Sequence, residues 1–500
     1  MKSISITPSQ LYEQPFRNHA RFCVGTGRMG LALTKEYLDE LRFVQDNIGF
    51  RYIRGHGLFC DDMAMYHEYE ENGETKVEYN YTYLDRVLDA YRKVNLAPFL
   101  ELGFMPEQMA SGSQTVFYWK GNTTPPADYD KWADMVTALF LHLFDRYGRE
   151  EVITWPVEVW NEPNLPGFWE NADMEEYFHL FEVTFRAVKR ADDRIRVGGP
   201  AVCGVRDEFW IRSFLEFCRK EGLHPDFVTR HHYTTGNPEP DGHYAYQELR
   251  PHDEGFANLK TSREAIDDFP EFAGMDIYIT EFSTSYIPNN PLHDSNENAA
   301  YEAGQLSRLG EVNEGYSYWT FGDVFEEKGV PFSEFHGGFG LVAAGCVPKP
   351  TFWTFKFYSD LERYDGTCLI RDRNLVLEKK TDGSYMGIAW NWGKETGDDI
   401  LIDLTLPAGT GREYAILTET VDPAVTNPVK TWHDLGEPRT PDEAQLALIK
   451  ESAGPRLSTQ RTSCEGGEVS LQVPVAKDGV VRFRLLPIRD EHDRGYRITI

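Results

Sequence analysis

Hydrophobic and polar positions follow two alternating patterns between about residue 20 and residue 355. Short β-rich runs are separated by segments of helical periodicity, as in residues 34–48, where Leu41, Val44 and Ile48 recur behind Thr34, a residue that can cap the first turn. This alternation is typical of a parallel sheet with crossover helices. Eight such pairs predict a closed (β/α)₈ barrel over residues 15–360, with all βα loops on the face where active sites lie. The predicted strands are residues 21–25, 50–54, 96–102, 156–160, 195–199, 227–233, 276–282 and 316–321.

The hydrophobic pattern changes after about residue 362. Short alternating runs appear between glycine, proline and aspartate turns, with little helical periodicity, which is typical of a β-sandwich. We therefore predict an accessory β-sandwich domain over residues 361–500. Residues 3–6 alternate in the same manner, so the segment 1–14 is a candidate for an added strand of that domain. The stretch 420–463 fits neither pattern.

Net charge narrows the range of partners. The 500 residues include 51 Lys and Arg against 80 Asp and Glu, a formal net charge of −29 at pH 7. Such a surface repels nucleic acid and anionic lipid, so we expect a neutral ligand and neither a nucleic-acid nor a membrane partner. No apolar run approaches the length that a bilayer requires.

The first residues and the cysteines bear on the compartment. The N-terminal sequence lacks the charged start, apolar segment and cleavage site of a secretory signal, which predicts a cytoplasmic protein. The seven cysteines are odd in number, far apart and never in a CxxC pair. We therefore expect reduced thiols, and no metal site is predicted.

Two glutamates end predicted strands at equivalent heights. The fourth strand runs into Trp-Asn-Glu-Pro and the seventh ends in Thr-Glu-Phe, so Glu162 and Glu281 are expected to point into one mouth, three strands apart. Glycoside cleavage needs such a pair, because one carboxyl protonates the leaving oxygen while the other captures or stabilises the developing oxocarbenium ion. The proton donor needs a raised pKa, typically about 6. Trp160, Phe168 and Trp169 are candidates for the apolar wall that raises it.

The sixth predicted strand adds polar side chains to the same mouth. Strand alternation places His231 and Tyr233 on one face and His232 on the other, so a tyrosine hydroxyl can hold Glu281. A single histidine at a strand end is more often structural than functional. Two histidines, His56 and His231, among the eight strand ends, with a tyrosine on the same face, favour a binding site.

These motifs resemble a known family. Trp-Asn-Glu-Pro on the fourth strand and Thr-Glu-Phe on the seventh look like the clan A retaining glycosidases. The runs at 54–57 (Arg-Gly-His-Gly), 230–233 (Arg-His-His-Tyr) and 318–327 (Tyr-Trp-Thr-Phe-Gly-Asp-Val-Phe-Glu-Glu) narrow the resemblance to glycoside hydrolase family 39, specifically its β-xylosidases, over nearly the whole chain. Gly322 departs from the pattern, in a place where serine is expected.

The resemblance implies a double displacement without cofactor, through a covalent glycosyl-enzyme intermediate and with retained anomeric configuration. It also implies release of xylose from the non-reducing end of short xylo-oligosaccharides, commonly by a tetramer. By position, Glu162 is the acid/base, Glu281 the nucleophile and Asn161 a ligand of the sugar 2-hydroxyl. The remaining residues implied for the sugar subsite are His56, His231, Tyr233, Trp319 and one of Glu326 or Glu327.

Other functions are compatible with parts of the sequence. Within the family, α-L-iduronidase and α-L-arabinosidase activities are alternatives. Recognition of a uronate calls for Lys or Arg near the sugar, whereas the loops we can place carry acids and aromatics, with Arg54 the main exception. A barrel that binds carbohydrate without catalysis is a further alternative, but both carboxylates are present.

The motif Gly-Thr-Gly-Arg-Met-Gly from Gly25 to Gly30 matches a dinucleotide-binding fingerprint and raises the alternative of a nicotinamide-dependent oxidoreductase. In such a fold the helix begins within the glycine loop, whereas here it is expected to begin at Thr34. The second strand also ends in Arg54 and not in the acid that binds the ribose of NAD. An arginine suits NADP, so this alternative is weakened but stays open.

Overall fold

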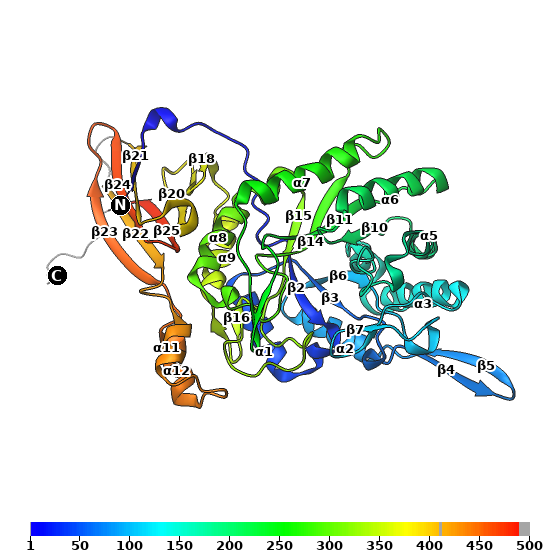
Figure 1. Ribbon diagram of the computed structural model, residues 1–500. Coiled ribbons are helices and arrows are strands. Elements are labelled where there is room, and N and C mark those ends of the chain that lie inside the picture. The colour runs from blue at the N-terminus through cyan, green and yellow to red at the C-terminus, as the bar shows by residue number, and fades with distance from the viewer. Residues whose placement is uncertain (1, 410–412, 490–500) are drawn as a thin grey trace.

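Eight parallel strands close into a barrel, as the sequence predicts (Figure 1). The computed structural model describes residues 2–409 and 413–489. Around the ring the strands follow the order β10-β11-β14-β15-β2-β3-β6-β9. Each barrel strand therefore lies beside the barrel strands that precede and follow it in the chain. The barrel strands are β2 (Cys23–Arg28), β3 (Tyr52–His56), β6 (Ala97–Leu102), β9 (Val157–Val159), β10 (Val197–Val202), β11 (Phe227–Tyr233), β14 (Asp276–Ser283) and β15 (Gly315–Tyr318).

Amphipathic helices surround the barrel. Helix α1 begins directly after Thr34, and its Leu41 and Val44 are at most 1% exposed because they face the strands. In α3, Leu139 and Leu143 are fully buried in the same manner. The helices of this part are α1 (Lys35–Asn47), α2 (Thr82–Lys93), α3 (Tyr129–Tyr147), α4 (Arg149–Val152), α5 (Met174–Ala191), α6 (Asp207–Glu221), α7 (His252–Asp267), α8 (Asn296–Leu306) and α9 (Pro350–Tyr364).

The glycine motif near the start of the chain lies largely within a strand. Strand β2 begins two residues later than predicted and continues to Arg28, through the first two glycines of the motif. A Cβ at Gly25 would come within 2.3 Å of the Trp319 ring, and a Cβ at Gly27 within 2.9 Å of the Phe325 ring. The glycines therefore make room for aromatic side chains over the strand. The dinucleotide-binding interpretation is not supported, because only a short 3-10 helix (Met29–Leu33) begins in this motif and the α-helix α1 begins later, at Lys35.

The C-terminal part forms two sheets that share one apolar core, as predicted for a β-sandwich. Strand β1 (Lys2–Ile6) pairs in parallel with β21 (Ile400–Pro407), so the first residues of the chain join this domain. The boundary near residue 360 stays a prediction, and the last residues assigned to the domain lie outside those described. The other strands are β18 (Thr367–Asp372), β19 (Leu375–Lys379), β20 (Tyr385–Asn391), β22 (Glu413–Val421), β23 (Arg456–Ser463), β24 (Glu468–Val475) and β25 (Gly479–Pro487), with the short helix α10 (Gly393–Thr396) after β20.

The stretch 420–463 contains a helical insertion between β22 and β23. It consists of α11 (Pro428–Asp434) and α12 (Glu443–Glu451), which lie below the sandwich in Figure 1. Trp432 of α11 packs on Phe335, from the loop after β15, with ring centroids 5.7 Å apart. The insertion therefore connects the accessory domain to a loop on the active face of the barrel.

Short two-stranded sheets extend several loops, and the β4–β5 hairpin projects away from the barrel (Figure 1). All seven cysteines are free thiols, as expected. Within residues 2–409 and 413–489, no helix combines the length and the apolar character needed to cross a bilayer. The short strands are β4 (Tyr66–Glu71), β5 (Glu74–Tyr79), β7 (Thr115–Val116), β8 (Gly121–Asn122), β12 (Glu239–Asp241), β13 (Tyr244–Tyr246), β16 (Val342–Ala343) and β17 (Val347–Pro348).

Candidate active site

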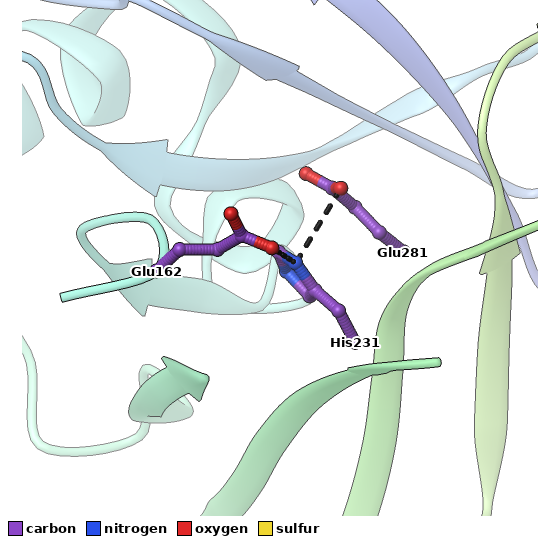
Figure 2. A group of neighbouring side chains, drawn as sticks. All are labelled: Glu162, His231 and Glu281. Carbon is purple, nitrogen blue, oxygen red and sulfur yellow. Dashed lines mark hydrogen bonds and ion pairs between the residues drawn. The ribbon is translucent and has the colours of Figure 1, made fainter. Parts of the chain in front are cut away.

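Glu162 and Glu281 face each other across the mouth of the barrel (Figure 2). Glu162 lies in the loop after β9 and Glu281 lies in β14, with β10 and β11 between them in the ring. One carboxylate oxygen of each residue and Nδ1 of His231 all lie within 4.8 Å of one another. This spacing is close to the separation of about 5–5.5 Å between the carboxyl groups of retaining glycosidases, and shorter than that of inverting ones.

His231 connects the two carboxylates. Its Nδ1 lies 2.8 Å from Oε1 of Glu162 and 3.4 Å from Oε2 of Glu281. Tyr233, two residues further along β11, donates its hydroxyl to the same Oε2 of Glu281 at 2.8 Å. His232 lies on the other face of the strand and forms a 3.1 Å hydrogen bond with α8. The predicted alternation is confirmed, and the tyrosine holds Glu281 as expected.

Glu162 is enclosed by its neighbours, and its side chain is only 10% exposed. Burial raises the pKa of its carboxyl to about 7, against the opposing influence of a nearby imidazole and guanidinium. Phe168 lines the same cavity, while Trp169 packs behind Trp160 with ring centroids 5.0 Å apart. Trp160 and Glu162 both adopt left-handed backbone conformations, with φ of 71° and 46°, which the surrounding contacts must hold in place. A buried carboxyl of this kind can donate a proton near neutral pH.

Arg54 lies at the electrostatic centre of the site. Its fully buried guanidinium donates to Glu158 at 2.6 Å, to Glu281 at 2.8 Å and to Oδ1 of Asn161 at 2.9 Å. It also lies 2.8 Å from Glu101. Burial alone lowers the pKa of Arg54, but the surrounding carboxylates raise it above its ordinary value, so the group stays cationic. Because one guanidinium binds both Glu281 and Asn161, it sets their relative positions and stabilises negative charge on Glu281.

His56, Trp319 and Glu327 form the opposite wall. The rings of His56 and Trp319 have centroids 4.7 Å apart, and Nε2 of His56 lies 3.6 Å from Glu281 and 4.0 Å from Glu327. Burial lowers the pKa of His56 to about 4, so the imidazole is neutral at pH 7. Burial, followed by the charges of Glu281 and Glu162, raises the pKa of Glu327 well above its usual range. An aromatic face beside a few polar groups suits a hydroxylated ring.

The structure separates Glu326 from Glu327, a choice that the sequence leaves open. Glu327 lines the cavity, whereas Glu326 accepts a hydrogen bond from Nη2 of Arg28 at 2.7 Å and is not part of the cavity wall. The expectation of a sugar contact is therefore corrected for Glu326. The chain turns at these residues, where the Gly329 N–H donates to the Glu326 carbonyl at 3.4 Å, and only one of the two side chains reaches the pocket.

The family resemblance predicts serine at position 322, and the structure explains why glycine is present there. A Cβ at this position would come within 2.4 Å of Oε2 of Glu40, whose side chain is fully buried. Burial raises the pKa of the Glu40 carboxyl well above its usual range. The glycine therefore belongs to the packing around Glu40 and not to the sugar pocket.

The cavity between these side chains has a volume of about 660 Å³. It is lined by every predicted site residue except Glu326. Phe117, Phe168 and Tyr286 add aromatic side chains to its walls. A concave site with convergent polar groups and aromatic walls is the usual form of a small-molecule binding site.

Glu162, His231 and Glu281 also have the spacing of a metal site, and no other group of three potential ligands within the described ranges has it. Both oxygens of Glu281 already accept protein hydrogen bonds, from Arg54 and Tyr233. A metal ion would lie beside the Arg54 guanidinium, and the two positive charges would repel each other. The group is better suited to proton transfer than to holding a cation.

Three charged residues inside the barrel strands belong to the site, and the sequence-based predictions do not assign them to it. Arg54, Glu101 and Glu158 belong to β3, β6 and β9, and their side chains meet at 0% exposure. Their position in the sequence could have indicated this, because a charged residue within an otherwise apolar barrel strand is buried only when it is paired with an opposite charge. Phe117, whose ring lies 5.7 Å from that of His56, comes from a long loop with no periodicity to indicate it.

An eight-stranded barrel with two carboxyls facing each other at the ends of strands three apart defines a glycoside hydrolase of the retaining type. The chain belongs to the glycosyl hydrolases family 39, whose model matches residues 3–470. The family resemblance noted in the sequence is thereby confirmed.

Full-length relatives agree with this assignment. The β-xylosidase of Geobacillus stearothermophilus is 46% identical over 496 residues, covering 98% of this chain and 97% of its own. The β-xylosidase of Caldicellulosiruptor saccharolyticus is 31% identical, over 92% of this chain and 93% of its own. The crystal structure of a monomeric β-xylosidase from Caulobacter crescentus CB15 matches with a TM-score of 0.86 and 32% identity, covering 98% of this chain and 100% of its own.

Proposed function

We propose that this protein is a retaining exo-β-xylosidase, in which Glu162 is the acid/base and Glu281 the nucleophile. One observation carries the proposal: two carboxylates face each other within 4.8 Å, in a family 39 barrel. Their environments differ, since burial raises the pKa of Glu162 to about 7 while Arg54 and Tyr233 donate hydrogen bonds to Glu281. The names of two full-length relatives support xylose as the glycone.

In the first step a carboxylate oxygen of Glu281 attacks the anomeric carbon, and the bond from that carbon to the glycosidic oxygen breaks. Glu162 gives its proton to the departing oxygen, so the leaving group departs as a neutral alcohol. The products of this step are an ester between the sugar and Glu281 and an ionised Glu162.

In the second step a water molecule attacks the anomeric carbon of the ester. The Glu162 carboxylate accepts the proton of that water, and Glu281 departs as a carboxylate. Two inversions at one carbon retain the configuration. Neither step requires a cofactor.

The hydroxyls of the bound xylose face polar groups that are already oriented. Asn161 is held through its Oδ1 by Arg54, which leaves its amide nitrogen to bind the 2-hydroxyl. His56 is neutral and Glu327 has a raised pKa. Each side chain can therefore donate a hydrogen bond to a sugar hydroxyl or accept one from it. These contacts favour an uncharged sugar ring.

The exo mode is supported by the closed end of the pocket. Trp319 is 2% exposed and belongs to a buried cluster with Phe325 and Phe339. This cluster occupies the space beyond the glycone, so the pocket accepts the non-reducing end of a chain and not its middle.

Charge around the glycone argues against a uronate. A uronic acid would bring its carboxylate to a pocket that already holds Glu162, Glu281 and Glu327, and Arg54 is enclosed by its own carboxylate partners. The arginines that line the cavity, Arg230 and Arg250, come from β11 and the loop before α7, away from the glycone wall. This arrangement favours a neutral pentose over iduronic acid. An α-L-arabinoside differs only in the placement of its hydroxyls and is the second candidate.

A panel of nitrophenyl glycosides tests the proposal. We expect the β-xyloside to be cleaved with the highest kcat/KM, and ¹H NMR to show β-xylose before mutarotation. A preference for the α-L-iduronide or the α-L-arabinoside would contradict the xylosidase assignment, and α-xylose as the first product would contradict the retaining mechanism. No cleavage of any glycoside would support a carbohydrate-binding barrel instead.

The tetramer and the cytoplasmic location stay predictions. The family resemblance supports an oligomer, although the relative from Caulobacter crescentus is described as monomeric. Sedimentation equilibrium of the purified protein distinguishes a tetramer from the 57.5 kDa monomer.

A further inference from the structure

Three carboxyl groups lie around the guanidinium of Arg54, and two of them are fully supported by hydrogen bonds. Glu158 accepts from Nε of Arg54 at 2.6 Å and, on its other oxygen, from a threonine hydroxyl at 2.7 Å. Glu281 accepts from Nη1 of Arg54 at 2.8 Å and, on its other oxygen, from a tyrosine hydroxyl at 2.8 Å. Each oxygen of these two groups therefore faces a donor, which stabilises both groups as anions.

Glu101, the third carboxyl group, has less support. Its Oε2 lies 2.8 Å from Nη2 of Arg54 and 2.8 Å from Nδ1 of His56. Its Oε1 is buried and has no hydrogen-bond partner in the part of the chain that the structure describes. If all three carboxyl groups were ionised, one guanidinium would face three negative charges in surroundings of low dielectric, which is costly. One of the three groups therefore holds a proton, and Glu101 is the least supported of them as an anion.

The neighbours of Glu101 decide where this proton lies. Oε2 faces Nδ1 of His56, so a proton on Oε2 can be donated to that nitrogen, whereas a proton on Oε1 would find no acceptor among the described residues. Burial lowers the pKa of His56 to about 4, so the imidazole is neutral and carries one proton. Since Nδ1 accepts, that proton lies on Nε2. Burial also raises the pKa of Glu101 to about 8, against the opposing charge of Arg54, which agrees with a neutral carboxyl at pH 7.

We propose that Glu101 is a neutral carboxylic acid whose proton fixes the tautomer of His56, so that Nε2 of His56 is a hydrogen-bond donor to the bound sugar. The inference rests on the proposed function, because this donor matters only if a hydroxylated ring occupies the cavity. Glu101 itself is not part of the cavity wall. It therefore acts through His56, as a positioning residue.

The geometry around Nε2 of His56 suits a donor. Nε2 lies 3.6 Å from Oε1 of Glu281 and 4.0 Å from Oε1 of Glu327, both longer than a hydrogen bond, so its proton is free to bind a hydroxyl oxygen of the glycone. The opposite tautomer would direct a lone pair toward the carboxylate of Glu281, and the two would repel each other. A proton on Nε2 instead favours the ionised nucleophile.

Neutron diffraction locates these protons directly. Crystals of the wild-type protein are exchanged into D₂O at a pD of about 6, below the pKa of Glu101. We expect one deuteron on Oε2 of Glu101, directed at Nδ1 of His56, and one on Nε2 of His56. An ionised Glu101, or a deuteron on Nδ1 of His56, overturns the inference. The measurement needs no substitution, so it does not depend on the folding of a variant.

A double-mutant cycle tests whether Glu101 acts through His56. Glu101→Met removes the proton donor at a similar side-chain size, and His56→Phe removes both ring nitrogens. For a nitrophenyl β-xyloside, kcat/KM should fall about tenfold in Glu101→Met and about 10–100-fold in His56→Phe. The double variant should be within about twofold of His56→Phe, because the loss of Glu101 has no further effect once the imidazole is absent. Losses that multiply would overturn the positioning role.

Glu302→Met is the matched control. Glu302 of α8 is also fully buried, and burial raises the pKa of its carboxyl to about 8, but it lies outside the cavity. In this variant kcat/KM should stay within about twofold of the wild type. An equal loss in Glu302→Met and Glu101→Met would overturn the specific role of Glu101. A deuteron on Nδ1 of His56 in an active enzyme overturns the inference alone, whereas a wild-type protein that cleaves no xyloside overturns the proposed function.

Discussion

Arg54 donates a hydrogen bond from Nη1 to Oε1 of Glu281 across 2.8 Å, and the two side chains are only 0% and 6% exposed. The same guanidinium is bound to Glu158 and lies beside Glu101, so a single cation is shared among three carboxylates. In surroundings of low dielectric, these contacts are far stronger than they would be in water. The geometry of the nucleophile therefore depends on this one arginine.

Removal of that cation should damage both the fold and the reaction. In Arg54→Met three buried carboxylates lose their positive partner, so the free energy of unfolding should fall by about 3–5 kcal/mol, as measured by urea denaturation. Arg212 pairs with Glu208 and Asp268 at the surface, and Arg212→Met should lose less than about 1 kcal/mol. Equal losses in the two variants would contradict the central role of Arg54.

Glu281→Ala should lower kcat on a nitrophenyl β-xyloside by about 10⁴-fold or more, because no covalent intermediate can form. Azide fits the space left by the carboxylate and attacks the same face of the sugar. It should restore turnover and yield the α-xylosyl azide, which ¹H NMR identifies. Wild-type activity in this variant, or a rescued product of β configuration, would refute the assigned nucleophile.

The pKa of Glu162, raised by burial to about 7, predicts the alkaline limb of the pH profile. The protonated form is the active one in the first step, so kcat/KM should decline as the pH rises through about 7. In Glu162→Gln this limb should disappear, and kcat/KM for a substrate with a poor leaving group should fall by about 10²–10⁴-fold. Dinitrophenyl xyloside needs no proton, so its first step should be little affected. A limb that persists unchanged in Glu162→Gln would show that another group titrates.

Glu327 and Glu326 provide a matched pair, since only Glu327 lines the cavity. Glu327→Gln should reduce kcat/KM by about 10–100-fold, through the loss of hydrogen bonds that a charged or protonated carboxyl makes to the sugar. Glu326→Gln weakens only the contact with Arg28 and should stay within a fewfold of the wild type. Steady-state kinetics of both variants on the β-xyloside tests this. A larger loss of kcat/KM in Glu326→Gln than in Glu327→Gln would contradict the assignment of the sugar contact to Glu327.

Gly25 is required by the Trp319 ring, because a Cβ there would come within 2.3 Å of it. Gly25→Ala should therefore displace the ring, lower the free energy of unfolding by about 1–3 kcal/mol and raise KM. Gly454→Ala adds the same methyl group in open space and should leave KM unchanged. Thermal unfolding and KM, measured together, test the prediction; an unaltered KM in Gly25→Ala would mean that Trp319 does not contact the sugar.

The sequence by itself determined the barrel, the sandwich and the position of the catalytic pair. Hydrophobic periodicity identifies strands and helices, and eight such pairs leave one closed arrangement with all strand ends on one face. The positions of Glu162 and Glu281 follow from this directly, because the sequence pattern puts each of them near the carboxyl end of a predicted barrel strand. The sequence also shows that His231 and Tyr233 share one face of their strand, since side chains alternate along a strand.

The tertiary structure alone decided which polar groups contact one another. Arg54 and Glu281 are 227 positions apart, and no local pattern connects them. The choice of Glu327 over Glu326 and the packing of α11 on the loop after β15 depend in the same way on segments distant in sequence. Periodicity reports which face of an element is buried, whereas the partner of a buried charge is set by the three-dimensional packing that brings the elements together.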